Sequence, residues 1–203
     1  MAGPTRDFWQ TRFESRHTPW DRASASPQLR VWLGAELAAS SLRIAVPGCG
    51  SGWEVAELAA AGHEVTALDY ADAAVQRTRS LLAEPGQTAR VEQADVLQWQ
   101  PVEPFDAIYE QTCLCALHPD QWTGYAAQLH RWLRPGGRLL ALFMQTLRTG
   151  AADGLIEGPP YHCDVHGMRA LFPEPQWQWP RPPYPRVPHP MGVAELAVML
   201  VRR

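Results

Sequence analysis

The sequence predicts an α/β protein built on a doubly wound, mostly parallel β-sheet. Short apolar runs alternate with stretches of helical spacing from Leu42 to Met144, a rhythm typical of parallel strands joined by crossover helices. A glycine-rich turn directly follows the first apolar run, where such sheets place a ligand-binding loop. After Met144 the alternation weakens, so we expect the sheet to end in one or more antiparallel strands.

Length, composition and charge agree with one globular domain over residues 1–203. Hydrophobic residues make up 46% of the 203 residues, which is enough to bury a core. The net charge is −3 without a basic stripe, so no nucleic-acid partner is expected. No apolar run approaches the roughly 20 residues of a membrane span, and residues 1–10 lack the layout of a signal peptide. We expect a cytoplasmic protein without membrane contact, as a monomer or weak dimer.

The cysteines fit free thiols in such a compartment. There are four, and only Cys113 and Cys115 lie close together in the sequence, as a CxC pair that matches no zinc pattern. Spacing alone also permits a metal site at His162, Cys163 and His166, but no metal is expected there.

The N-terminal part of the chain leads into the first strand. Residues 5–40 show helical spacing in pieces, broken at Thr18-Pro19. The run over 42–46 ends in Pro47 and Gly48, which predicts a buried strand followed by a tight turn.

Two helices and two strands continue the pattern. Residues 53–61 have helical spacing, and Gly62 ends that helix. Residues 64–68 form the next expected strand, which ends at Asp69. A helix over 72–82 is closed by Glu84-Pro85-Gly86, and residues 89–94 are expected to form the third strand.

The second half of the sheet follows the same order. A strand over 105–109 precedes a helix over about 120–133, and the turn Arg134-Pro135-Gly136-Gly137 leads into a strand over 138–144. The last expected strand covers 193–201.

Many of the 19 prolines fall in one stretch, residues 172–190. Proline fixes φ and removes a donor, so this segment is expected to be extended. A rigid surface connection is the first interpretation, and a proline-rich recognition motif is the alternative.

The glycine loop is the central motif and lies between a strand and a helix. In VPGCGSGWEV, Gly48, Gly50 and Gly52 allow a sharp turn and a close approach of the backbone to a ligand. The third glycine comes one residue earlier than in the dinucleotide fingerprint GxGxxG, and Trp53 takes its place. This spacing favours S-adenosylmethionine, which has no pyrophosphate, over a nicotinamide cofactor. The remaining alternative is a turn that only packs the helix on the sheet.

Two acids at the ends of the next strands support that cofactor. Asp69, with Tyr70 beside it, can accept hydrogen bonds from both ribose hydroxyls. Asp95 can accept from the adenine amine, and Val96 can pack on the ring. We therefore expect Gly48, Gly50, Gly52, Asp69, Tyr70, Asp95 and Val96 to bind the cofactor.

Four segments together resemble the thiopurine S-methyltransferase superfamily, and most closely its halide and thiol methyltransferase branch. They are FWQTRFESRHTPWD, PGCGSGWEV, FDAIYEQTCLCALHP and GPPY, spread from Phe8 toward the C-terminus. The glycine loop is common to many methyltransferases, whereas TPWD (18–21) and GPPY (158–161) are more specific in combination. The resemblance implies the Rossmann-like class I methyltransferase fold, S-adenosylmethionine as cofactor and S-adenosylhomocysteine as product.

The resemblance also implies roles for particular residues. Trp9, Phe13 and Trp20 match aromatic positions of an N-terminal segment (1–40) that covers the cofactor as a lid, and aromatic faces attract a sulfonium cation. Core packing is the alternative role for these rings. Gln111 matches a position that faces both cofactor and acceptor. Relatives commonly carry an aromatic or basic residue there, and aromatic residues where this chain has Cys113 and Leu114.

The implied reaction is methyl transfer to a small soft nucleophile: a thiol, hydrosulfide, a halide, or a selenium or tellurium species. An in-line displacement from sulfonium needs alignment and desolvation more than a strong base. Tyr161 and Gln111 are the expected catalytic residues, followed by Cys115. Any one of His118, His162 and His166 could instead deprotonate a thiol, or serve a structural role. Two other functions remain open: an O- or N-methyltransferase for a small metabolite, and a non-catalytic cofactor-binding partner or sensor.

Overall fold

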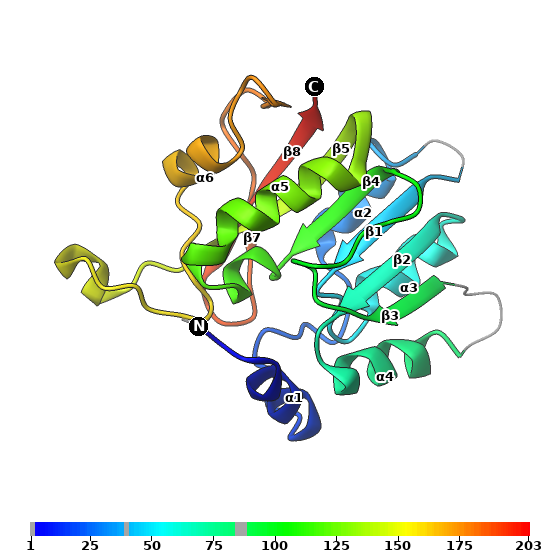
Figure 1. Cartoon of the computed structure of the whole chain (residues 1–203), viewed down its shortest axis with the longest axis horizontal. Coiled ribbons are helices and arrows are strands. Elements are labelled where there is room, and N and C mark those ends of the chain that lie inside the picture. Colours follow the sequence, from blue (N-terminus) through cyan, green and yellow to red (C-terminus); the bar gives the residue numbers. More distant parts are fainter. Residues whose placement is uncertain (1–2, 39–40, 84–88) are drawn as a thin grey trace.

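The computed structural model describes residues 3–38, 41–83 and 89–203. It confirms the α/β prediction, with a central sheet between helices (Figure 1). The expected end of the second helix at Glu84-Pro85-Gly86 lies outside the described residues. The helices are α1 (Arg6–Glu14), α2 (Pro27–Leu33), α3 (Trp53–Ala60), α4 (Asp72–Leu81), α5 (Trp122–Trp132) and α6 (Val165–Leu171), with short 3₁₀ turns at Leu114–Ala116, Pro119–Gln121 and Thr149–Asp153.

The described strands form one sheet in the order β3-β2-β1-β4-β5-β8-β6, with β7 also paired to β8. Strands β1 to β5 pair in parallel, and β8 runs antiparallel to β5 as expected from the end of the alternation. The strands are β1 (Arg43–Pro47), β2 (Glu64–Asp69), β3 (Ala89–Gln93), β4 (Phe105–Gln111), β5 (Leu133–Gln145), β6 (Trp177–Gln178), β7 (Arg186–Pro188) and β8 (Ala194–Arg202).

The sheet reverses its order between β1 and β4, and this reversal determines where a ligand can lie. The chain builds outward from β1 through β2 to β3, then returns and continues through β4 to β5 on the other side. Crossover connections on opposite sides leave a crevice at the carboxyl ends of the two central strands. The glycine loop follows β1, so it lies at this crevice.

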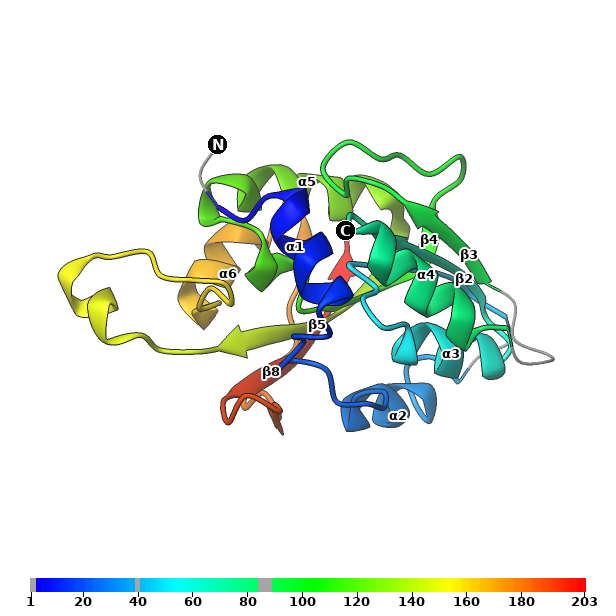
Figure 2. The same ribbon diagram turned by 90° about the horizontal axis from the view of Figure 1, so that it is seen from below.

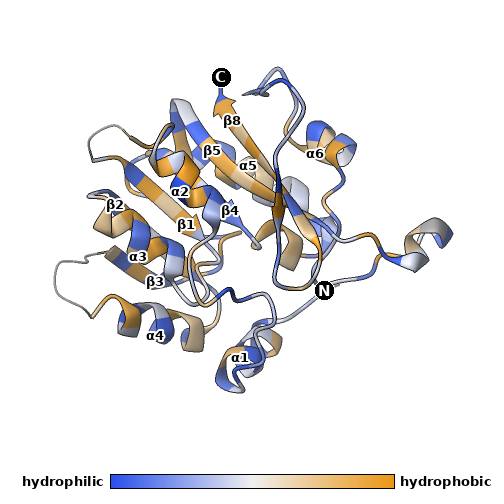
Figure 3. Ribbon diagram, turned by 180° about the vertical axis from the view of Figure 1, so that it is seen from behind, coloured by the Kyte–Doolittle hydropathy of each residue, from blue (hydrophilic) through white to orange (hydrophobic). Residues whose placement is uncertain are grey.

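Strand β5 shows how the two faces of the sheet divide the core. Leu139, Ala141 and Phe143 pack in one cluster with residues of α5, whereas Leu140 and Leu142 pack in another with residues of α2 and α3. This alternation is the period of two expected for a strand buried on both faces. Figure 2 shows α5 on one side of the sheet and α2 and α3 on the other, and Figure 3 shows the apolar β1 from the second side.

The turn predicted at 134–137 falls inside β5, which begins at Leu133 rather than Arg138. Phe105 pairs with Leu133 and Ala107 pairs with Arg138, so the residues between Leu133 and Arg138 form a bulge. Gly136 has a φ of 74°, which glycine tolerates. The predicted turn is therefore a bulge within the strand, and pairing with β4 starts before it.

The proline-rich segment 172–190 is extended in part, as predicted, but it is not only a surface connection. Two short strands within it, β6 and β7, pair with β8 at the edge of the sheet, where proline is tolerated. Trp177 is 1% exposed and Val187 is 5% exposed, so both belong to the core. The helix α6 before it was not predicted.

An arm formed by residues 146–160 leaves the body after β5 and projects away from it in both views (Figures 1 and 2). Its base is held by backbone and side-chain hydrogen bonds. The Cys163 N–H donates to the Met144 carbonyl at 2.8 Å, and the Thr146 N–H donates to His162 Nδ1 at 3.1 Å. The arm is therefore anchored where it leaves and where it returns.

Candidate active site

A cavity of about 400 Å³ lies at the carboxyl ends of the parallel strands. Its walls come from the N-terminal segment, the glycine loop, the ends of β2 to β5 and the return of the arm. It brings together ten of the predicted residues: Trp9, Phe13, Trp20, Gly48, Gly50, Asp69, Tyr70, Asp95, Val96 and Gln111.

The glycine loop has the backbone conformation that its composition predicts. Gly48, Gly50 and Gly52 have φ of 63°, 55° and 84°. A side chain at Gly52 would also meet Thr78 of α4 at 2.8 Å. Gly48 and Gly50 line the cavity, whereas Gly52 caps the start of α3 and does not line it. The third glycine of the motif thus serves the turn and the packing of α3.

Asp69 lies at the end of β2 with its carboxylate tied to the loop. One carboxylate oxygen accepts from the Gly50 N–H and the other from the Ala71 N–H, each at 2.9 Å. The side chain is 7% exposed, and burial raises its pKa to about 6 against the lowering effect of these backbone donors. Each oxygen keeps a lone pair for a further donor in the cavity.

Beyond Asp69 the cavity is bounded by residues that follow β2 and β3. Tyr70, which is 40% exposed, and Val96, which is 7% exposed, both line the cavity. One oxygen of Asp95 accepts from the Leu97 N–H at 2.9 Å. A flat ring can lie between these side chains, next to the Asp69 carboxylate.

The aromatic residues of the N-terminal segment pack edge to face beside the glycine loop. The Trp20 ring lies 5.6 Å from Trp9 and 6.0 Å from Phe13, measured between centroids. All three line the cavity, and Phe13 is also buried against Ala71 and Ala74. Core packing and cavity lining are therefore combined in the same rings.

Asp21 is a cavity residue that the sequence reasoning passed over. Its carboxylate accepts from the Ser51 hydroxyl at 2.5 Å and from Trp53 Nε1 at 2.9 Å. It thus joins the N-terminal segment to the glycine loop on both sides of Gly52. The signal was present, because Asp21 is the last residue of the TPWD motif.

Gln111 is the last residue of β4, and both ends of its amide are engaged. Its Oε1 accepts from the Tyr109 hydroxyl at 2.7 Å, and its Nε2 donates to the two oxygens of Glu195 at 3.0 and 3.2 Å. Arg22 Nη2 donates to the same Glu195 carboxylate at 3.2 Å. Gln111, Tyr109 and Arg22 line the cavity, and Glu195 lies behind them.

Glu195 is fully buried in β8, and sequence reasoning missed it. Burial raises its pKa to about 7, while the hydrogen bond from Gln111 and the charge of Arg22 act in the opposite direction. Among the residues 194–201, which are otherwise apolar, it is the one charged residue. That isolated acid in a buried strand was the available signal.

Tyr161 does not line the cavity. It is 5% exposed, its N–H donates to the Cys115 carbonyl at 2.7 Å, and its ring packs against His118. The ring also fills the space beside Gly158, where a Cβ atom would collide with it. Pro159 and Pro160, which precede Tyr161, do line the cavity, so Tyr161 supports the wall from behind.

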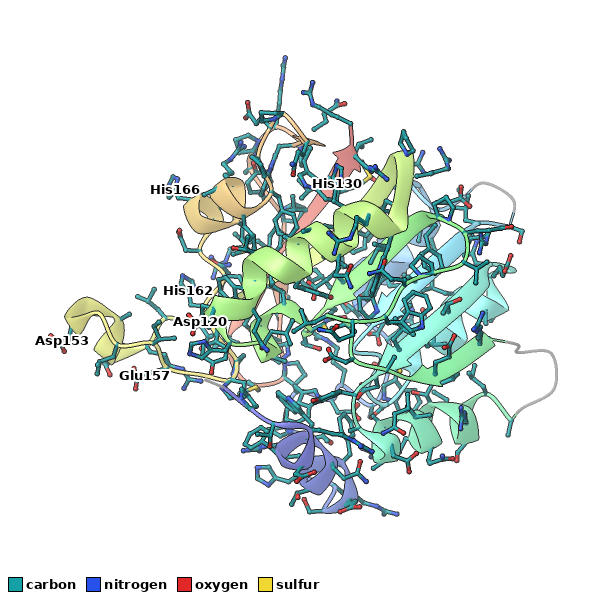
Figure 4. All side chains as sticks on the ribbon, viewed as in Figure 1. Asp120, His130, Asp153, Glu157, His162 and His166 are labelled. Atoms are coloured by element: carbon teal, nitrogen blue, oxygen red, sulfur yellow. The ribbon has the colours of Figure 1, made fainter. Side chains whose placement is uncertain are left out.

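The candidate histidines lie outside the cavity lining. His118 Nδ1 accepts from the Asp120 N–H at 3.3 Å, and His162 accepts from Thr146 at the base of the arm. His166 is exposed on α6, and Figure 4 shows it and His162 on the side of the molecule near the arm. Within residues 3–38, 41–83 and 89–203, no group of three or more His, Cys, Asp or Glu side chains could hold a metal.

All four cysteines are free and buried. Cys49, Cys113 and Cys115 line the cavity. Burial raises the pKa of Cys113 and Cys115 well above the ordinary value for a thiol. These side chains are neutral thiols and act as small apolar groups at the cavity wall.

A parallel sheet with a GxGxG loop after β1, an acid at the end of β2 and a cavity across both defines the class: a class I S-adenosylmethionine-dependent methyltransferase. The family model for thiopurine S-methyltransferase matches residues 4–181. The chain belongs to the thiopurine S-methyltransferase family.

Comparisons with individual proteins agree with this placement. Thiocyanate methyltransferase 1 of Arabidopsis thaliana is 32% identical over 162 residues, which cover 77% of this chain and 67% of the relative. A thiopurine S-methyltransferase of Vibrio cholerae is 28% identical over 184 residues, covering 82% and 80%. The 1,6-didemethyltoxoflavin-N1-methyltransferase of Burkholderia thailandensis shares the fold, with a TM-score of 0.78 at 21% identity over 97% of this chain and 86% of that one.

No helix in the part of the chain that the structure describes is long and apolar enough to cross a membrane.

Proposed function

We propose that the protein transfers a methyl group to the sulfur of a small soft nucleophile, such as a thiol, hydrosulfide or a thiocyanate-like anion. One observation carries this proposal. Besides Gln111, the cavity lining includes apolar and sulfur-containing side chains, those of Cys115, Met144, Pro159 and Met191. These side chains make favourable contact with a polarisable sulfur atom, whereas they give a hydroxyl or amine no strong hydrogen-bond partner.

The names of the relatives support the same acceptor class. The Arabidopsis relative is a thiocyanate methyltransferase and the bacterial relatives are thiopurine S-methyltransferases. Both acceptors present a polarisable sulfur. Halides and selenium or tellurium species share that softness and belong in the same test panel.

Bound S-adenosylmethionine supplies an activated methyl group on a sulfonium. In our proposal the Asp69 carboxylate accepts from the ribose hydroxyls, while Tyr70, Asp95 and Val96 surround the adenine. Trp9 and Trp20 present aromatic faces that attract a cation and exclude water. Gly48 and Gly50 let the backbone approach the cofactor closely.

The chain's remaining residues align the acceptor. Its sulfur forms one new bond to the methyl carbon as the sulfonium–methyl bond breaks, so a thiolate gives a thioether and no base is needed in that step. Gln111, whose amide is held by Tyr109 and Glu195, forms the part of the cavity wall against which the acceptor lies. Tyr161 is a positioning residue that acts through the Pro159-Pro160 wall.

The test is transfer of label from S-adenosylmethionine to a panel of acceptors by the purified protein. We expect methylated product from thiols, hydrosulfide or thiocyanate, and little from phenols and amines. Transfer confined to phenols or amines would instead establish an O- or N-methyltransferase. Cofactor binding by calorimetry without turnover of any acceptor would leave a cofactor-binding partner or sensor.

A further inference from the structure

Arg22 is a cation in the cavity wall that the cofactor contacts described above do not use. It follows the TPWD motif, lines the cavity and has a side chain that is 15% exposed. Its neighbour Asp21 faces the other way, toward the glycine loop, where Ser51 and Trp53 bind its carboxylate.

The contacts of Arg22 place its guanidinium on the acceptor side. Nη2 donates to the Pro188 carbonyl of β7 and to Glu195 of β8. In the sheet order, β8 and β7 lie beyond β5, whereas Asp69 and Asp95 follow β2 and β3 on the opposite side of β1. The guanidinium is thus held next to Gln111 and away from the expected nucleoside site.

Arg22 is also incompletely satisfied. Its Nε is buried without a hydrogen-bond partner among the described residues, although a buried guanidinium nitrogen ordinarily has one. The ion-pair partner of Arg22 is Glu195, which also accepts from Gln111. The Glu195 carboxylate is therefore shared between Arg22 and Gln111. The arrangement fixes a cation at the cavity wall, and an anion in the cavity would meet the exposed part of its side chain rather than the buried Nε.

We propose that Arg22 is the recognition residue for the acceptor and holds it as a small anion beside Gln111, with Glu195 fixing the orientation of both side chains. This inference rests on the proposed methyl transfer. It narrows the acceptor class to species that are anionic when bound, such as a thiolate, hydrosulfide or thiocyanate. The negative charge is consumed in the transfer, because an anion and a sulfonium give two neutral groups, and the uncharged product no longer pairs with Arg22.

The test compares Arg22→Gln and Arg22→Lys with the wild type, and uses Arg181→Gln as a matched control at an exposed arginine outside the cavity. Calorimetry measures thiocyanate binding to the protein saturated with S-adenosylhomocysteine, which requires no turnover. We expect Arg22→Gln to weaken thiocyanate binding at least about tenfold, Arg22→Lys to weaken it less, and Arg181→Gln to leave it unchanged. The affinity for S-adenosylhomocysteine should stay within about twofold in all variants.

Three outcomes separate this inference from the proposed function. Unchanged thiocyanate affinity in Arg22→Gln overturns the inference, whatever the acceptor panel shows. Weaker binding of S-adenosylhomocysteine with unchanged thiocyanate binding also overturns it, and assigns Arg22 to the cofactor's carboxylate. Absence of transfer to any sulfur or halide acceptor by the wild type overturns the proposed function, while the binding measurement still decides whether Arg22 holds anions.

Discussion

Two buried carboxylates in the site, Asp69 and Glu195, differ in what they bind. Asp69 accepts from backbone N–H groups of the glycine loop and borders open space, whereas Glu195 accepts only from side chains and lies behind the wall. Both have a raised pKa because burial disfavours the charged form. In our proposals, Asp69 therefore contacts the cofactor, and Glu195 acts on the acceptor through Arg22 and Gln111.

For Asp69, the substitution Asp69→Asn should weaken binding of S-adenosylhomocysteine by roughly 1–3 kcal/mol, the scale of a lost charged hydrogen bond. The wild-type affinity should fall as the pH decreases through about 6, because protonation removes an acceptor. Calorimetry between pH 5 and pH 8 measures both effects. Asp153→Asn, at an exposed position, serves as the control. If Asp69→Asn binds S-adenosylhomocysteine like the wild type, the ribose lies elsewhere.

The raised pKa of Glu195 makes the stability of the fold depend on pH. The folded protein holds this proton more tightly than the unfolded chain, so the free energy of unfolding falls as the pH rises from 4.5 to about 7. A shift of that size corresponds to a few kcal/mol in order of magnitude. Denaturation by urea should show a smaller pH slope for Glu195→Gln than for the wild type. An identical slope would mean that this carboxyl is ionised throughout.

The same titration should affect anion binding at Arg22. Below pH 7 a neutral Glu195 leaves the Arg22 charge uncompensated, and above pH 7 the ionised carboxylate compensates it. Thiocyanate affinity should therefore fall as the pH rises through about 7, and it should vary less with pH in Glu195→Gln. The groups that interact electrostatically with this pair come from several elements: Glu54, Tyr109, Glu110, Cys115, Cys163 and His189. Thiocyanate titrations at a series of pH values measure this dependence.

At the level of elements, the N-terminal segment divides into two parts. Helix α2 buries Leu29 and Trp32 against the sheet, whereas α1 packs on the start of α4 and carries two of the cavity aromatics, Trp9 and Phe13. Asp21, between the two helices, is the link to the glycine loop. The N-terminal covering of the site is therefore held by a few polar contacts and three aromatic rings.

Removing that link should loosen the segment without unfolding the sheet. We expect Asp21→Ala to increase cleavage in residues 5–22 during limited proteolysis, since the Ser51 and Trp53 donors lose their acceptor. Saturating S-adenosylhomocysteine should restore part of the protection. Equal cleavage rates in variant and wild type would show that the aromatic contacts suffice.

The wall formed by Pro159 and Pro160 depends on the contact between Gly158 and Tyr161. A Gly158→Ala substitution places a methyl group against the Tyr161 ring, so the wall must shift. We expect kcat/KM for the acceptor to fall at least about tenfold, with little change in the affinity for S-adenosylhomocysteine. Cofactor affinity that falls in parallel would mean that the wall belongs to both sites.

The parts that could be predicted from sequence are those governed by local patterns. The strands and helices from β1 to β5 follow from apolar periodicity, and the glycine loop and Asp69 from their positions after β1 and β2. Glu195 and Arg22 could not be paired in advance, because they are 173 residues apart and meet only through the addition of β8 to β5. Tyr161 belonged to a specific motif, yet the motif does not reveal whether its hydroxyl faces the cavity or its ring supports the wall.

At the scale of the whole molecule, the cavity is shared by both halves of the sheet and by the N-terminal segment, so a ligand in it joins them. A ligand that binds only the folded state stabilises that state by about 2.7 kcal/mol at a ligand concentration of about 100 Kd. For a domain of this size we expect S-adenosylhomocysteine to raise Tm by roughly 5–10 °C. Differential scanning calorimetry measures the shift, and Asp69→Asn should reduce it at the same ligand concentration.

The anchored arm has a consequence for how such a protein can change. Cys163 and His162 form hydrogen bonds with Met144 and Thr146 at the base of the arm. The residues between these two anchor points can therefore be replaced without changing the strands that they connect. Insertions or deletions at its tip should leave β5 and β8 in place, while its return carries Pro159 and Pro160 of the cavity wall. New acceptors can therefore evolve, or be engineered, by replacing this one segment while the cofactor half of the protein stays constant.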